Sequence, residues 1–282
     1  MSNWKDEFVK CLEGSTSANS QLEKALDMKA EHMPKHIYRY QSNSDDRRKS
    51  LATDKIWLSS PDKWNDPYDC EFFISDASVE AEAHKRLEKK FMGANPELLA
   101  IGKTKAAQIV SEKLSEIKKW KRLCKACCFN EDPTSMLMWG HYAENHRGFC
   151  IEYDLEGPKA VQFRHNLYPV VYRDKPYDLT PWAVSLVDGS PVFNPQWPTL
   201  GLIHKFNGWE YEREWRSISV SLEIEPDHDR PAPTPTRVFL GSKMEMANKQ
   251  AFRAICEPKG IEVFEMHRAD DSFKLFPAPF KQ

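Results

Sequence analysis

Acidic, basic and aromatic side chains alternate along the segment Trp209-Glu210-Tyr211-Glu212-Arg213-Glu214-Trp215-Arg216. Successive residues of a strand point to opposite faces. We therefore expect a strand over residues 212–222 with Glu212, Glu214 and Arg216 on one face, and Glu210 on the same side. Carboxylates held this close repel one another, so a buried one has a raised pKa unless a cation lies beside it.

One of these carboxylates could stabilise positive charge that develops on a substrate. A carboxylate has this role when a glycosidic bond breaks through an oxocarbenium-like transition state. Glu214 is the first candidate and Glu212 the second, with Arg216 or Lys205 as the neighbouring cation. The alternative is an edge strand whose solvated charges discourage aggregation.

Arg39 stands between Tyr38 and Tyr40 in a short apolar strand expected over residues 36–40. A guanidinium in such a place needs an anionic partner. It could hold a phosphate or pyrophosphate in bidentate fashion while the neighbouring rings supply a stacking surface. An ion pair with an internal carboxylate is the other interpretation.

The run Asn65-Asp66-Pro67-Tyr68-Asp69 has the composition of a turn, because Asn and Asp bond to their own backbone and Pro fixes φ. With Glu71 nearby, Asp66 and Asp69 could also bind magnesium in a nuclease. His141 and His146 are five residues apart, about 140° around a helix, and therefore cannot easily share a metal. We expect no metal site.

The seven cysteines have no regular spacing. Cys124, Cys127 and Cys128 resemble half of a zinc site, but no second Cys/His pair stands at a usable distance, so buried thiols are the expectation. A nucleophile pair of Cys150 with His141 or His146 has no visible activating group.

The chain has 282 residues with a 40% hydrophobic share, enough for one sizeable domain. Its formal net charge of -2 gives no global attraction to nucleic acid or acidic lipid. No apolar run approaches the roughly 20 residues that cross a bilayer, and the start shows no basic segment followed by an apolar one. We therefore expect a soluble cytoplasmic protein without a membrane partner.

Hydrophobic periodicity and turn residues divide the chain into short elements. Helices are expected over 1–33 (one or two), 44–51, 78–120 (two, with a turn near 93–96), 133–145 and 244–256. Strands are expected over 36–40, 55–60, 125–129, 148–153, 168–172, 212–222, 237–240, 261–265 and 272–276. Residues 176–198 are expected to form a long loop, and the lysine-rich run 113–125 a solvated helix face.

These elements do not alternate as βαβ units, so the fold class is α+β, with mainly antiparallel strands in one or two small sheets flanked by helices. The expected organisation is a helical arm over 1–33 and a single domain over 34–282 with a helical insertion at about 78–120.

Four segments resemble the bacterial and phage-associated family known as domain of unknown function 2971. They are Tyr38–Tyr40, Asn65–Asp69, Leu137–Ala143 and Tyr211–Arg216. The resemblance spans roughly residues 36 to 278 and implies no settled activity.

A weaker resemblance links the order of these segments to the ADP-ribosyltransferases: an early strand with a central Arg or His, a middle strand-helix segment, and a late Glu-x-Glu strand. It implies that Arg39 holds the pyrophosphate or ribose of NAD and that Glu214 is catalytic, with Glu212 assisting the acceptor. The turn over 129–135, which contains Asn130, would flank the nicotinamide ribose. The remaining residues assigned to NAD by this resemblance are Tyr38, Tyr40, His141 and Tyr142. The Ser or Thr that usually ends the middle strand is absent, since Asn130 follows Phe129.

The leading hypothesis is therefore an ADP-ribosyltransferase-like enzyme that cleaves NAD and passes ADP-ribose to a macromolecular acceptor, in a toxin or phage-defence setting. The alternatives are a metal-dependent nuclease or phosphoesterase using Asp66 and Asp69, and a noncatalytic module that senses a nucleotide or phage component. Acceptor and oligomeric state stay open.

Overall fold

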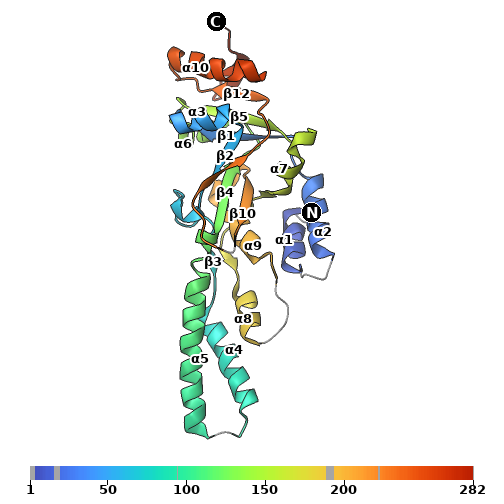
Figure 1. Ribbon diagram of the computed structural model, residues 1–282, viewed down its shortest axis with the longest axis vertical. Coiled ribbons are helices and arrows are strands. Elements are labelled where there is room, and N and C mark those ends of the chain that lie inside the picture. Colours follow the sequence, from blue (N-terminus) through green and yellow to red (C-terminus); the bar gives the residue numbers. More distant parts are fainter. Residues whose placement is uncertain (1–3, 16–19, 94, 189–193, 222, 282) are drawn as a thin grey trace.

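The structure is a computed structural model that describes residues 4–15, 20–93, 95–188, 194–221 and 223–281. The molecule is elongated (Figure 1). Helix α10 (Met246–Cys256) lies at one end of its long axis, and a hairpin of α4 (Asp76–Lys90) and α5 (Pro96–Ile117) projects at the other. Small sheets and short helices form the body between them, which confirms the α+β class.

The largest sheet has five strands in the order β1-β5-β12-β13-β14. Their bounds are His36–Gln41, Phe149–Asp154, Arg237–Leu240, Glu262–Arg268 and Leu275–Pro279. Only β12 and β13 run parallel, and the other neighbours are antiparallel. The sheet places β1, which carries Arg39, at its edge.

A second sheet has three strands in the order β4-β10-β6. The strands are β4 (Cys124–Phe129), β10 (Trp215–Val220) and β6 (Leu167–Pro169). It meets the first sheet where Tyr38 and Asn130 exchange two backbone hydrogen bonds of 2.8 Å. The edge strand of one sheet therefore lies beside the end of β4 in the other.

Shorter elements complete the body. Two-stranded sheets pair β2 (Lys55–Leu58) with β11 (His228–Pro231), β3 (Phe72–Phe73) with β8 (Tyr177–Asp178), and β7 (Val171–Arg173) with β9 (His204–Phe206). The remaining α-helices are α1 (Trp4–Glu13), α2 (Gln21–Glu31), α3 (Asp45–Ala52), α6 (Met136–His141), α7 (Val161–His165), α8 (Thr180–Asp188) and α9 (Trp197–Ile203).

The N-terminal helices contribute to the core. Phe8 and Leu12 of α1 are fully buried in a cluster that also holds Trp120 and Leu200 from the body. Burying side chains of this size stabilises the packing by about 1.5–3 kcal/mol each. The division into an arm over 1–33 and one domain over 34–282 stays a prediction.

The helix expected over 133–145 is shorter in the structure. Asp132 and Pro133 belong to the turn before it, and α6 starts after Ser135, whose hydroxyl accepts a hydrogen bond from the Met138 amide at 3.4 Å. The helix ends at His141 and cannot extend to Asn145, because Glu144–His146, which follow Tyr142 and Ala143, all have φ between 51° and 69°. Left-handed backbone cannot continue a right-handed helix.

The turn after α6 is closed by two glycines. The Gly148 amide donates to the Ala143 carbonyl at 2.8 Å, and the Gly241 amide donates to the Gly148 carbonyl at 2.9 Å. A Cβ at Gly148 would collide with the Gln41 carbonyl oxygen, and one at Gly241 with that of His146. Only glycine permits this approach of the turn to β1 and to the end of β12.

The loop expected over 176–198 was wrong for most of its length, since β8 and α8 lie within it and α9 begins at Trp197. Its Pro and Trp content suggested a loop, but Ala183 and Leu179 are buried against the base of the hairpin. Residues 189–193 of this stretch lie outside the described residues. The strand expected over 168–172 is two short strands, β6 and β7, which pair with different neighbours.

No helix of the described residues is long and apolar enough to cross a membrane.

Candidate functional site

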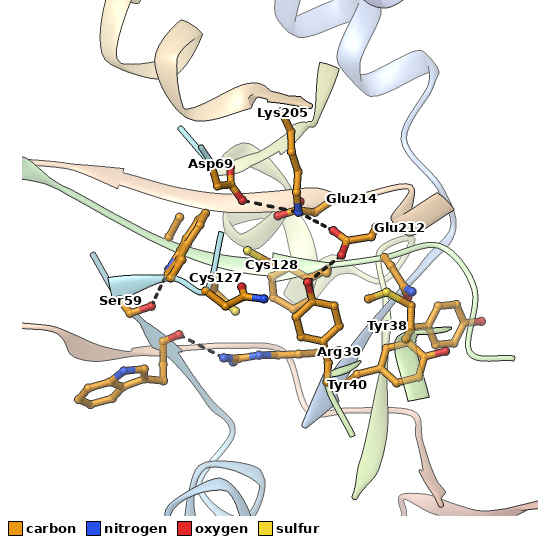
Figure 2. A pocket seen from close by; sticks show the side chains of 18 of the residues that line it. Tyr38, Arg39, Tyr40, Ser59, Asp69, Cys127, Cys128, Lys205, Glu212 and Glu214 are labelled. Carbon is orange, nitrogen blue, oxygen red and sulfur yellow. Dashed lines mark hydrogen bonds and ion pairs between the residues drawn. The ribbon is translucent and has the colours of Figure 1, made fainter. Parts of the chain in front are cut away.

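A cavity of about 220 Å³ lies where β1 meets β4 and the segment before β10 (Figure 2). Its walls come from segments far apart in the sequence. The side chains that line it and matter here are Tyr38, Arg39, Tyr40, Arg47, Asp69, Cys128, Asn130, Tyr142, Lys205, Glu212 and Glu214.

One end of the cavity is cationic. The Arg39 guanidinium donates to the Trp57 carbonyl at 3.3 Å, and Arg47 of α3 lies close enough that Arg39, after burial, lowers its pKa. Neither guanidinium forms an ion pair in the part of the chain that the structure describes. Two like charges that form no ion pair among the described residues make this end suited to an anion.

The other end holds a buried cluster of five ionised groups. The Lys205 ammonium lies 2.6 Å from Glu212, 2.9 Å from Glu214 and 3.5 Å from Asp69. The Arg216 guanidinium lies 2.6 Å from Glu214 and 2.8 Å from Asp69. Three carboxylates therefore share two cations. All five side chains have at most 5% of their surface exposed.

Two tryptophan rings cover the cations of this cluster. Trp64 lies over the Arg216 guanidinium at 4.8 Å, and Trp209 over the Lys205 ammonium at 5.2 Å. The rings attract the cations through their π faces and keep water away. Ion pairs without water are strong and are costly to break.

The two glutamates of the cluster differ in their proton affinity. Burial alone would raise the pKa of Glu214, but Arg216 and Lys205 hold it well below its usual value. Burial and the neighbouring Glu214 raise the pKa of Glu212, despite Lys205. Glu214 is thus a fixed negative charge, whereas Glu212 is the group better able to exchange a proton.

Tyr142 connects the α6 helix to this cluster. It follows the last residue of α6, and its hydroxyl donates to Glu212 at 2.7 Å. Burial, followed by the Glu212 charge, raises the pKa of Tyr142, so the phenol stays protonated and keeps donating. The hydroxyl therefore orients one oxygen of Glu212 while Lys205 holds the other.

The strand expected over 212–222 was wrong in its first part. Residues Asn207–Glu212 form a 3₁₀ helix, Arg213 has a left-handed backbone with φ 44°, and β10 begins at Trp215. Glu212 and Glu214 share Lys205 because the chain turns between them, and Glu210 is exposed. Alternation along the sequence concealed this turn. Leu222 lies outside the described residues.

Of the other residues assigned to NAD, Tyr38 and Tyr40 line the cavity and His141 does not. The rings of Tyr38 and Tyr40 border the cavity but pack with Trp139 and Phe239 in a core cluster, and the Tyr40 hydroxyl donates to the Asp132 carbonyl at 2.7 Å. Tyr40 is buried and offers little free surface for stacking, whereas Tyr38 is only partly buried. His141 is exposed and does not line the cavity.

Asn130 has a buried side-chain oxygen without a donor, a feature that the sequence could not reveal. It is 1% exposed, it lines the cavity, and its side-chain oxygen has no hydrogen-bond partner. A buried acceptor without a donor costs about 1–3 kcal/mol. A ligand with a donor group would remove this cost, so Asn130 is a candidate contact.

Cys128 corrects the expectation that all the thiols of β4 are buried. Cys124 and Cys127 are buried, but Cys128 is exposed, and it lines the cavity together with Cys127. All the other cysteines are buried. The enclosing walls and then Glu214 raise the pKa of Cys128, which makes it a poor nucleophile at neutral pH.

The carboxylates considered for a metal already have protein partners. Asp69 accepts two bonds from Arg216, Glu71 binds Lys121 at 2.5 Å, and Asp66 accepts from the Tyr68 amide at 2.8 Å. Among the described residues, no group of three or more His, Cys, Asp or Glu side chains is arranged to hold a metal ion.

A comparison with protein families matches residues 138–217 to a family described as protein of unknown function (DUF2971). The matched segment contains Tyr142, Lys205, Glu212, Glu214 and Arg216, and it ends within β10. No curated protein and no solved structure matches the chain. The similarity therefore covers one wall of the cavity and names no reaction.

Proposed function

We propose that the cavity binds NAD and that the protein is an ADP-ribosyltransferase-like enzyme. The observation that carries the proposal is the shared cavity itself, with two guanidinium groups that lack a carboxylate partner among the described residues at one end and a buried glutamate pair at the other. A dinucleotide with a negative pyrophosphate and a positive nicotinamide ring has this charge distribution.

The size of the cavity limits how much of NAD it encloses. Ligand cavities commonly measure about 300–1,000 Å³. At about 220 Å³ the cavity is smaller, so it suits the nicotinamide ribose, with the pyrophosphate at Arg39 and Arg47 and the adenosine outside. Asn130 would accept a hydrogen bond from the carboxamide or a ribose hydroxyl.

In the proposed reaction the bond between nicotinamide and the ribose C1′ breaks, and neutral nicotinamide leaves with the electron pair. Positive charge moves to the ribose, where the fixed anion Glu214 stabilises it. An acceptor hydroxyl, amine or water then bonds to C1′ and gives its proton to Glu212, whose pKa is raised. The products are ADP-ribosylated acceptor, nicotinamide and one proton.

The test is nicotinamide release from NAD by the purified protein, with and without bacterial lysate as a source of acceptor. Glu214→Gln should lower the rate about 10²–10³-fold, because it removes the charge that opposes the oxocarbenium ion. Glu210→Gln is the matched control, since this glutamate is two residues from Glu212 but exposed, and its rate should not change.

Glu214→Gln also disturbs the ion cluster, so a second variant separates chemistry from folding. Tyr142→Phe removes only the hydroxyl that orients Glu212. It should keep the fold and slow the reaction about tenfold or more, as expected for a misplaced proton acceptor.

Binding is measured separately through Cys128, the one exposed cysteine. Because the pKa of the Cys128 thiol is raised, maleimide labelling is run at alkaline pH and for long times; bound NAD should slow it further, and Cys128→Ser should remove the label. Protection by NAD without nicotinamide release in any mixture would replace the enzyme by the noncatalytic sensing module. Neither protection nor release would reject NAD as the ligand.

A further inference from the structure

The tip of the α4–α5 hairpin, residues 85–105, exposes large apolar side chains. Met92 is 88% exposed, Leu98 66%, Ile101 65% and Phe91 48%. They lie at and beside the turn between the helices, the part of the molecule farthest from α10 (Figure 1). Grouped exposed apolar residues usually mark a contact surface.

The same tip is strongly basic. Six basic residues stand against two acidic ones, a net charge of +4 for the tip. The whole chain has a net charge of -2, so the rest of it carries -6. The basic residues are Lys85, Arg86, Lys89, Lys90, Lys103 and Lys105, and the acidic ones are Glu88 and Glu97. The charge distribution would direct the tip toward an anionic surface.

We infer that the hairpin tip docks on an anionic lipid bilayer. Apolar side chains at a turn enter the boundary between headgroups and acyl chains, while lysines around them attract acidic lipids. The expectation of no membrane partner rested on the lack of a spanning segment and on the net charge of the whole chain. A surface contact through a local basic region needs neither a spanning segment nor a basic chain overall.

Two other occupants fit the tip less well. Nucleic acid would use the lysines but would leave Met92, Leu98 and Ile101 without a partner. A second copy of the chain could cover the apolar residues, but it would bring together two tips of charge +4.

The experiment is sedimentation of the full chain with vesicles. The protein should bind vesicles of phosphatidylcholine with phosphatidylglycerol. Its affinity for vesicles of phosphatidylcholine alone should be at least about tenfold lower. High salt should weaken the binding, since it screens exposed charges.

Two double variants separate the two parts of the surface. Phe91→Ser with Met92→Ser removes apolar contact, and Lys89→Glu with Lys90→Glu reverses charge; each should weaken binding about tenfold or more. Phe273→Ser is the matched control, because this ring is 95% exposed but lies between β13 and β14. All these side chains are exposed, so the thermal melting of each variant should match the original.

Several results would overturn the inference. They are the absence of binding to anionic vesicles, and unchanged binding by either double variant. A DNA oligonucleotide that binds through Lys89 and Lys90 while vesicles do not would assign the tip to nucleic acid. Dimers in light scattering that disappear with Phe91→Ser and Met92→Ser, without vesicle binding, would assign it to a second copy.

Discussion

The ion cluster beside the cavity and the α4–α5 hairpin both contain many charges, but their charged side chains differ in solvent exposure. In the cluster, Arg216 is fully buried and its carboxylate partners are at most 5% exposed. On the hairpin, the Lys118–Asp76 pair is about half exposed on both sides. Breaking an ion pair should therefore destabilise the body strongly, whereas solvent screens the pairs on the hairpin and leaves them little effect on stability.

The largest effect expected from this difference follows removal of Arg216. Arg216→Met leaves Asp69 and Glu214 buried with Lys205 as their shared cation, so the free energy of unfolding should fall by about 3–5 kcal/mol. Urea unfolding measures it. Arg253→Met is the control: Arg253 pairs with Glu257 alone, the two side chains are 35% and 71% exposed, and its loss should cost about 1 kcal/mol or less. Equal costs would remove the distinction.

A buried histidine next to the cluster gives a smaller effect that depends on pH. Burial lowers the pKa of His204 to about 4. The unfolded chain binds this proton near pH 6.5, so the stability from neutral His204 is complete above pH 6.5 and is lost as pH falls toward 4. Between pH 7 and 5 it should lose about 2 kcal/mol.

His204→Asn should flatten this dependence in urea unfolding at pH 7 and pH 5. His141→Asn, which changes an exposed ring, should keep it. If the free energy of unfolding of His204→Asn still falls between pH 7 and pH 5, another group causes the loss. The pKa of His204 would then not be lowered by burial.

The smallest effect belongs to the hairpin. Lys118→Ala breaks the 3.2 Å pair with Asp76 and should change the free energy of unfolding by no more than about 0.5 kcal/mol. A loss comparable to that of Arg216→Met would show that the hairpin charges support the fold, contrary to the comparison.

The sequence predicted the cavity residues, and Arg216 or Lys205 as the cation beside the glutamates, but it did not predict that Asp69 belongs to the same ion cluster. Arg39, Glu212 and Glu214 were named from local patterns, and Asn130 and Tyr142 from the resemblance; the structure brings all five to one cavity. Their roles in binding and catalysis stay predictions. Most strands were also predicted, since period-2 patterns report burial directly.

The features that were missed depend on contacts between distant residues. Asp69 was considered as a metal ligand because other carboxylates are near it in the sequence. Its ion-pair partner Arg216 is 147 residues away, so no local pattern could indicate it. The turn at Arg213 was missed because alternating side chains imply a strand. In the structure the chain turns between Glu212 and Glu214, and Lys205 bonds to both of them. The short α8 was missed because its packing against the hairpin outweighs the Pro and Trp content of the segment.

The two glycines at the turn after α6 bear on how variants of this protein should be interpreted. Gly148 and Gly241 are outside the cavity, yet a side chain at either would displace the turn that follows Tyr142, and with it the hydroxyl that orients Glu212. A substitution there would imitate damage to the reactive groups themselves. In a random mutagenesis screen, inactive variants at these two positions would therefore reflect a displaced backbone. A second substitution that restores the turn would restore activity in them, but not in variants that lack a reactive group.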